Sequence, residues 1–264
     1  MSAPLRPIRM ILIALIAFLH GSAQQEFSKD SLFGLGKKPS DLAIGKFPWK
    51  GMVVPAALTG YGIIAIRSKP LWNLNDQIQD ELWNNRPHDL NHMDDYLRFV
   101  PALAVYGLNM AGVKGKHDLK DRTMILAIST AVMGGTVFTL KHVVKERSPT
   151  NRDSLAYHSF PSGHTAEAFM TAEFLWQEYH ERSPWYGIAG YACAIATGYL
   201  RLYNNQHWFS DVVAGAGIGI ASTKFAYWLY PKIKRAFSKD KSMNSMVLPY
   251  YRIGEAGLHW VSRL

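Results

Sequence analysis

Three short clusters in the second half of the chain carry side chains that could bind and transfer a phosphate group. The first is Lys-His-Val-Val-Lys-Glu-Arg-Ser-Pro at residues 141–149, and the second is Pro-Ser-Gly-His at residues 161–164. The third contains Arg201, His207 and Asp211. Histidines can serve as nucleophile or general acid, and fixed cations stabilise the negative charge that develops during transfer. Because these groups occur together, phosphoryl transfer is the chemistry that the sequence indicates.

The third cluster contains a histidine and a carboxylate at helical spacing. His207 and Asp211 are four residues apart, so on a helix they would share a face. A carboxylate beside one ring nitrogen fixes the tautomer and leaves the other nitrogen free to attack. The spacing alone is more typical of a structural or solvated pair, so the catalytic interpretation depends on the other two clusters.

The second cluster has the composition of a helix start. Pro161 and Gly163 interrupt regular structure, and helical spacing resumes at Thr165. Backbone N–H groups at a helix N-terminus attract anions, and glycine permits their close approach. Ser162 could add a hydroxyl donor, and His164 would lie beside the anion. A capped turn with an incidental histidine explains the tetrapeptide alone equally well.

Three cations stand beside the ends of apolar runs. They are Lys141, Arg147 and Arg201. Taken singly, a basic residue in such a place often marks only the edge of a membrane. Their coincidence with the two histidines favours a role in binding phosphate.

Apolar runs predict the helices that must position these clusters. The runs cover residues 51–66, 99–113, 124–140, 165–179, 185–200 and 212–230. Strand-like alternation is scarce, so we predict an all-α fold, a helical bundle of about six core helices. Residues 70–98 are polar and predict an amphipathic helix that is broken at Pro87.

The placement of charge favours a membrane-embedded bundle. The mean hydropathy of −0.08 is low for such a protein, and most runs are shorter than the roughly 20 residues of a span. Basic residues nevertheless gather at residues 114–122 and 232–241, as expected for cytoplasmic segments. All three clusters then fall on the outer face, provided that residues 51–66 do not cross the membrane completely.

The N-terminus has the features of an export signal. Arg6 and Arg9 precede an apolar run that ends at Leu19, and small residues follow at Gly21 and Ala23. We predict a signal peptide at residues 1–23, or an uncleaved anchor. The remaining divisions that we predict are an exposed lead-in at 24–50, a phosphatase helical domain at 51–240 and a C-terminal tail at 241–264.

Together, the three clusters resemble the motifs of the type 2 phosphatidic acid phosphatase superfamily, which also contains vanadium haloperoxidases and bacterial acid phosphatases. The family pattern is Lys, six residues, Arg-Pro, later Pro-Ser-Gly-His, and later Ser-Arg, five residues, His, three residues, Asp. The motifs cover about 70 residues of this chain. The matching positions are Lys141, Pro149, Pro161, Ser162, Gly163, His164, Arg201, His207 and Asp211.

Two positions depart from the family pattern. Ser148 stands where the family has arginine, and Leu200 stands where it has serine. The first change removes a bidentate phosphate donor, and arginine is hard to replace in that role. Arg147 is one place earlier and is the expected substitute.

The resemblance implies a mechanism and a set of residue roles. His207 would be the nucleophile that forms a phosphohistidine, Asp211 would orient it, and His164 would act as general acid and then base. The expected phosphate ligands are Lys141, Arg147, Ser162, Gly163 and Arg201. Neither a metal nor a cofactor is expected, because the chain has no metal-ligand spacing such as paired Cys or His-Glu-x-x-His.

We therefore expect a lipid phosphatase of the bacterial cell envelope, in the inner membrane with its active site facing the periplasm. Candidate substrates are lipid A phosphates, undecaprenyl diphosphate, phosphatidylglycerophosphate and phosphatidic acid, and the outward-facing site favours the first two. The formal charge of +9 comes without a nucleic-acid-binding signature, so the partners expected are the membrane and the lipid, with no obligate protein partner. The alternatives are a soluble periplasmic acid phosphatase, a vanadate-dependent haloperoxidase and a non-catalytic phospholipid-binding protein.

Overall fold

The computed structural model describes residues 46–85, 88–150, 158–239, 245–252 and 255–262. The predicted signal peptide, most of the lead-in and Pro87 lie outside the described residues. The elements are α2 (Trp49–Ala65), α3 (Lys69–Gln79), η3 (Asp80–Asn84), α4 (Asp94–Leu97), α5 (Val100–Met110), α6 (Leu119–Val144), α7 (Gly163–Tyr179), α8 (Pro184–Tyr203), α9 (Phe209–Lys239), β1 (Ser245–Arg252) and β2 (Glu255–Ser262).

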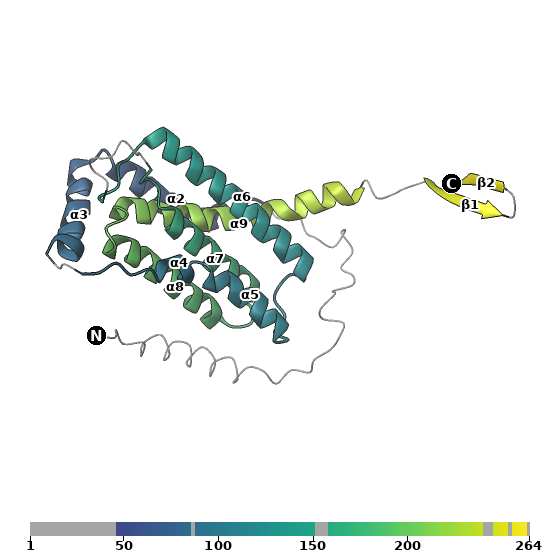
Figure 1. The fold of residues 1–264 in the computed structure, drawn as a ribbon, viewed down its shortest axis with the longest axis horizontal. Helices are drawn as coiled ribbons and strands as arrows, with labels where there is room; N and C mark the ends of the chain where they lie inside the picture. Colours follow the sequence, from purple (N-terminus) through teal and green to yellow (C-terminus); the bar gives the residue numbers. More distant parts are fainter. Residues whose placement is uncertain (1–45, 86–87, 151–157, 240–244, 253–254, 263–264) are drawn as a thin grey trace.

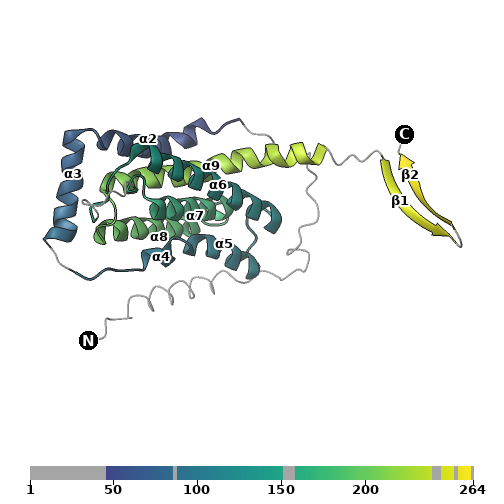
Figure 2. The ribbon, with the colours of Figure 1, turned by 45° about the horizontal axis from the view of Figure 1, so that its top comes forward.

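The predicted helical bundle is confirmed. Each apolar run of the sequence forms one of the longer helices, namely α2, α5, α6, α7, α8 and α9. The short strands β1 and β2, which the sequence did not predict, pair as an antiparallel hairpin in the C-terminal tail. The chain reverses direction between successive long helices, so α7 and α9 begin at the end of the bundle where α6 and α8 finish (Figure 1). That end lies beside α3, which runs across the other helices (Figure 2).

Helix α6 is longer than the apolar run that predicted it, because its ends are set by local hydrogen bonds. Asp118 caps its start by accepting a hydrogen bond from the Asp121 N–H at 2.7 Å. Lys145 ends it in a left-handed conformation with φ of 53°. Polar residues are therefore included at both ends of a helix whose centre is apolar.

Small residues allow α9 to pack closely between two neighbours. A Cβ atom added to Gly215 would lie 2.6 Å from the carbonyl oxygen of Ser162, at the start of α7. One added to Gly217 would lie 2.5 Å from the carbonyl oxygen of Pro55 in α2. Such close approach through small residues is typical of helices packed in a membrane. The start of α9 is thereby held against the start of α7.

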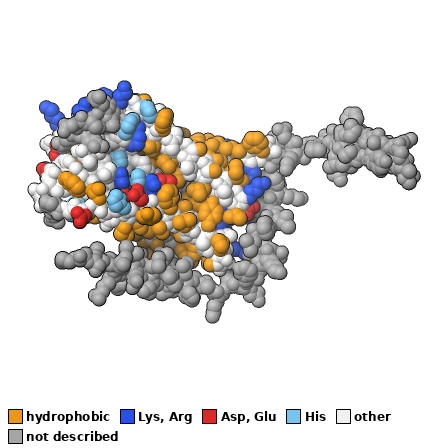
Figure 3. Space-filling view, in the orientation of Figure 1, with side chains coloured by type: hydrophobic (Ala, Val, Ile, Leu, Met, Phe, Trp, Pro, Cys, Tyr) orange, Lys and Arg blue, Asp and Glu red, His pale blue; other side chains and the backbone are white. Residues whose placement is uncertain are grey.

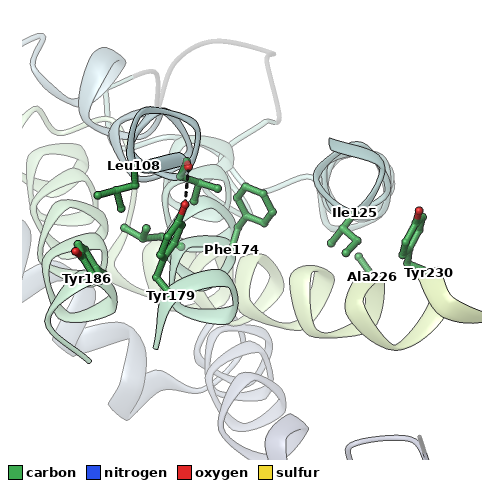
Figure 4. Packing of buried hydrophobic residues seen from close by; sticks show 9 residues of the cluster. Leu108, Ile125, Phe174, Tyr179, Tyr186, Ala226 and Tyr230 are labelled. Atoms are coloured by element: carbon green, nitrogen blue, oxygen red, sulfur yellow. Dashed lines mark hydrogen bonds between the residues drawn. The ribbon is translucent and has the colours of Figure 1, made fainter. Parts of the chain in front are cut away.

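A hydrophobic cluster fills the bundle toward its other end. It includes Phe174 and Tyr179 of α7, Ile125 of α6 and Ala226 of α9, all nearly or fully buried (Figure 4). The Tyr179 hydroxyl lies 3.1 Å from the carbonyl oxygens of Val105 and of a residue in the loop after α5. The buried Tyr179 hydroxyl therefore has hydrogen-bond partners, which offset the cost of removing it from water.

Two described helices are long and apolar enough to cross a membrane. They are α6 and the part of α9 from Phe209 to Phe237. Helix α2 alone is too short, and it reaches the required length only together with α3 and η3, which bend away by 92°. Hydrophobic side chains also form a band on the outside of the bundle, between charged groups at its two ends (Figure 3). These features indicate a membrane protein, and incomplete crossing by residues 51–66 stays a prediction.

Candidate active site

The Pro-Ser-Gly-His cluster forms the start of α7, as its composition predicts. Ser162 is the N-cap, and its Oγ lies 3.4 Å from the Thr165 N–H and 2.9 Å from Thr165 Oγ1. Gly163 is the first helical residue, so the N–H groups of this turn are available to an anion. The Ser162 hydroxyl is fully buried in the cap, so it would have to leave these contacts to bind phosphate.

His207 and Asp211 are in contact, but not through the shared helix face that their spacing predicts. His207 precedes α9, and Asp211 lies in the first turn of that helix. The distance from His207 Nδ1 to Asp211 Oδ2 is 3.4 Å. The same oxygen accepts hydrogen bonds from Ser159 Oγ at 2.5 Å and from the Trp208 N–H at 3.0 Å. The carboxylate is fully buried, so the histidine faces a fixed and shielded negative charge.

The environment keeps His207 neutral. Its side chain retains only 10% of its exposed surface, and this burial lowers its pKa below the ordinary value, against the opposing effect of Asp211. Arg201 also lowers the pKa of His207 through its positive charge, and it acts on His164 in the same direction. Both imidazoles therefore lie within the field of one arginine, which brings the second and third clusters to one site.

Two hydrogen bonds join the first cluster to the third, one from a side-chain hydroxyl and one to a backbone carbonyl of the first cluster. Ser148 Oγ donates to the carbonyl oxygen of Gln206 at 2.7 Å, and Trp208 Nε1 donates to that of Arg147 at 2.8 Å. Ser148 thus has a structural role at the position where arginine was expected. The Arg147 side chain is exposed, and its predicted contact with phosphate stays a prediction.

Lys141 ties the first cluster to the segment that leads into α7. It lies in the last turn of α6, and its ammonium group donates to the carbonyl oxygens of His158 and Ser159. Ser159 is the residue whose hydroxyl reaches Asp211. The lysine is therefore connected to the His207–Asp211 pair through one intervening residue.

Two carboxylates that the sequence did not predict complete the site. Asp94 Oδ2 accepts a hydrogen bond from Arg201 Nη1 at 2.5 Å, and Asp95 Oδ1 lies 2.9 Å from His164 Nε2. Asp94 is almost fully buried, whereas Asp95 is 44% exposed. Hydrogen bonding to His164 lowers the pKa of Asp95. The adjacent acidic residues lie about 70 to 107 positions from their partners, so no local spacing could indicate these contacts.

The donor set of the site suits an anion better than a metal ion. Among the described residues, the ligand atoms of Asp94, Asp95 and His164 lie within 4.8 Å of one another. Both carboxylates are already engaged, with Arg201 and with His164. Arg201 Nε is buried and has no hydrogen-bond partner within the described structure, as expected of a donor that awaits an anionic oxygen.

Comparison with known proteins gives a consistent result. The chain is 36% identical over 165 residues to a lipid A 1-phosphatase of Porphyromonas gingivalis, covering 62% of this chain and 36% of that protein. It is 36% identical over 76 residues to the bacitracin transport permease protein BcrC of Bacillus licheniformis, covering 29% of this chain and 36% of that protein. The chain thus spans about a third of the length of these curated relatives.

Two solved structures are also similar. One is Aquifex aeolicus LpxE, with TM-score 0.46 and 24% identity, covering 58% of this chain and 94% of the other. The second is a transmembrane PAP2 type phosphatidylglycerolphosphate phosphatase from Bacillus subtilis, with TM-score 0.39 and 18% identity, covering 72% and 98%. Residues 122–235, which contain all three clusters, match the PAP2 superfamily. This segment therefore matches the family whose motifs the three clusters resemble.

Proposed function

We propose that this protein is a membrane phosphatase that removes phosphate from a lipid through a phosphohistidine on His207. The contact between His207 Nδ1 and Asp211 carries the proposal, because it leaves Nε2 as the attacking nitrogen. Burial lowers the pKa of the imidazole and so keeps that nitrogen unprotonated at neutral pH. A neutral, oriented imidazole is the form that can act as a nucleophile.

The reaction takes two balanced steps. In the first, Nε2 of His207 attacks phosphorus, the bond from phosphorus to the leaving oxygen breaks, and protonated His164 gives that oxygen a proton. In the second, water attacks the phosphohistidine, His164 takes a proton from the water, and the nitrogen–phosphorus bond breaks to release phosphate. Asp95 occupies Nε2 of His164, so Nδ1 is the nitrogen left to exchange a proton with the substrate.

Charge stabilisation comes from groups that are already in place. Arg201 is held by Asp94 through Nη1. Its Nε, which has no hydrogen-bond partner among the described residues, is available to an oxygen of the phosphate. Lys141 and the N–H groups at the start of α7 add positive potential from two other directions. We also assign phosphate contacts to Ser162 and Arg147. Donors fixed before the reaction usually supply the largest part of catalysis, and losing one costs about 2.7–4 kcal/mol.

Lipid A phosphate is the substrate that we favour. The similarity to a lipid A 1-phosphatase over 165 residues supports this choice, and undecaprenyl diphosphate is the next candidate. The two helices long enough to span a membrane favour a lipid substrate over the small esters of a soluble acid phosphatase. We place the protein in a bacterial inner membrane with the site facing the periplasm, because Lys114, Lys116 and Lys120 lie at the opposite end of the bundle.

Purified protein assayed against a panel of lipid phosphates tests this proposal. We expect phosphate release from lipid A and no requirement for peroxide or halide, which separates the reaction from that of a haloperoxidase. Brief reaction with radioactive substrate followed by denaturation should trap label on the wild type and none on His207→Ala. Release without trapped label would overturn the phosphohistidine, and absence of both would favour a lipid-binding protein.

A further inference from the structure

A cavity lies at the end of the bundle farthest from the proposed active site. Its volume is about 380 Å³, within the range of small-molecule sites. Its walls come from the start of α2, the loop before α6, and the later turns of α7 and α9. Lys224 of α9 lines it, and Asp211 lies 13 residues earlier on the same helix, which corresponds to about 20 Å. The cavity is therefore separate from the His207 site.

The lining of this cavity is basic. The polar residues that line it include Lys46, Lys116, His117, Gln177 and Lys224. None of the described residues that line it is an aspartate or a glutamate. An anion would therefore meet hydrogen-bond donors from several elements, although Lys116 and Lys224 also contact Glu181 and Glu173 outside the lining.

Carboxylates lie behind the lining and hold its donors in place. Glu173 is 2.8 Å from Lys224 Nζ, and it is almost fully buried. Glu178, also buried, accepts hydrogen bonds from the His117 N–H at 3.1 Å and from Tyr227 Oη at 2.7 Å. Ionisable groups are rare inside membrane helices unless they have a function or a partner. Here partners are present, and they fix the positions of Lys224, His117 and Tyr227 in the cavity wall.

Aromatic residues place the cavity at the boundary between water and membrane. The ring of Trp228, which lines it, packs edge-on against Phe47 with centroids 4.9 Å apart. Lys232 Nζ lies 3.4 Å from the Trp228 ring centroid, and Trp49 is 75% exposed. Tryptophan and lysine side chains concentrate where headgroups meet the hydrocarbon. Lys224 belongs to the span Phe209–Phe237, so the cavity opens at the end of a membrane helix.

We propose that this cavity binds the phosphate headgroup of an anionic membrane lipid. Basic pockets between membrane helices recognise such headgroups, and lysines contact phosphate as point charges. The acyl chains would extend along the outside of α2, where Val53 and Val54 are more than 60% exposed. The bound lipid would join the start of α2 to the loop before α6, and so stabilise the bundle at this end.

Lipid binding to the full chain in neutral detergent tests the proposal. Native mass spectrometry and thermal unfolding would be measured with phosphatidylglycerol, phosphatidylcholine and soluble glycerol phosphate. We expect phosphatidylglycerol to bind saturably and to raise the unfolding temperature, because it offers both the anion and the acyl chains. Phosphatidylcholine or glycerol phosphate at equal concentration should do neither. An equal response to all three would overturn the proposal, and a response to glycerol phosphate alone would assign the cavity to a soluble anion.

Matched lysine variants locate the binding. We expect Lys46→Gln combined with Lys116→Gln to weaken phosphatidylglycerol binding about tenfold, the loss typical of charge-assisted contacts. Lys114→Gln combined with Lys120→Gln is the control, since these exposed lysines lie at the same end without lining the cavity. Equal losses in the two double variants would overturn the proposal. Lys224 is not changed, because this would leave Glu173 buried without its cation.

The same measurements separate this site from the catalytic one. His207→Ala should bind phosphatidylglycerol as the wild type does, and the Lys46 and Lys116 double variant should retain phosphohistidine trapping. Loss of lipid binding in His207→Ala would mean that the lipid occupies the active site instead. Failure of the phosphatase proposal would leave the lysine comparison intact, because it measures binding alone.

Discussion

The two ends of the bundle both concentrate charged side chains, but they hold them differently. At the proposed catalytic end the charges stand in connections and at helix ends, with His207 just before α9 and Asp94 and Asp95 on the short α4. At the other end they stand inside long helices, as Glu173 and Glu178 do in α7. The charged groups at the proposed catalytic end thus lie in segments from which they can face a substrate. Those inside the long helices at the other end join the helices to one another.

The partners of the charges differ in the same way. At the proposed catalytic end Arg201 lowers the pKa of two histidines, and its buried Nε has no hydrogen-bond partner in the part of the chain that the structure describes. At the other end the buried carboxylates have several donors, for example Asp121 with Tyr230 at 2.6 Å and Lys234 at 2.6 Å. Satisfied networks contribute to a unique packing, whereas groups left with capacity can bind a ligand. Substitutions of the groups around His207 should therefore affect activity, whereas substitutions of the buried carboxylates at the other end should affect stability.

The largest effect is expected from His207→Ala. Removal of the nucleophile should reduce phosphate release to background, at least about a thousandfold, because losing a covalent nucleophile typically costs at least that much. The unfolding temperature should change little. His142→Ala is the matched control, since this exposed histidine at the end of α6 has no assigned role. Activity within a few-fold of wild type would remove His207 from the mechanism.

The reverse pattern is expected from Glu178→Ala at the other end. Its loss removes the carboxylate that pairs with the buried Arg122, whose Nε lies 3.7 Å from Glu178 Oε2. Breaking a buried charge pair on one side costs about 3–5 kcal/mol, so thermal unfolding in detergent should shift markedly downward. Turnover per folded molecule should persist at low temperature.

Glu181→Ala controls for the charge change. This exposed residue pairs with Lys116 at 2.7 Å, and surface pairs contribute about 0–1 kcal/mol. A stability loss as large as that of Glu178→Ala would contradict the contrast between buried and exposed groups at this end. Complete loss of turnover in folded Glu178→Ala would contradict the division between the two ends.

Asp95→Asn should change the pH dependence of the reaction. Burial and Arg201 lower the pKa of His164, while its hydrogen bond to the Asp95 carboxylate raises it. Without the carboxylate the pKa of His164 falls further, so a smaller fraction is protonated at a given pH. The alkaline limb of the kcat–pH profile should therefore move to lower pH, with a rate loss of several-fold near neutrality.

A kcat–pH profile distinguishes this effect from simple damage. A purely structural role for Asp95 would lower the rate by the same factor at every pH. Asp89→Asn, an exposed substitution in the loop before α4, should leave the profile unchanged. Asp95 acts through His164 in this scheme, so the KM for lipid should change less than kcat.

These contacts also mark how far the sequence could predict the structure. The six helices α2, α5, α6, α7, α8 and α9 could be predicted from apolar runs, because the pattern that indicates a helix lies within one continuous segment. The histidines and Arg201 follow from spacing that resembles a family. Asp94 and Asp95 could not be predicted, because their partners lie on α7 and α8 and only the packing of α4 brings them together. The contact of His207 with Asp211 was predicted from a shared helix face. In the structure His207 precedes α9, and only Asp211 lies within that helix.

The last prediction concerns the position where the chain departs from the family pattern. Arg147→Ala should reduce kcat/KM about tenfold if its exposed guanidinium reaches the lipid phosphate, as charge-assisted hydrogen bonds contribute about 1.5–3 kcal/mol. Lys145→Ala, an exposed cation two residues earlier, controls for general attraction of an anionic substrate. Equal losses in both variants would contradict a direct contact between Arg147 and the phosphate, and would indicate that Arg147 acts only through its surface charge. Ser148→Arg removes the hydrogen bond from Ser148 Oγ to the Gln206 carbonyl, which joins the first cluster to the third. The variant should raise turnover or shift substrate choice only if the new arginine compensates for this loss.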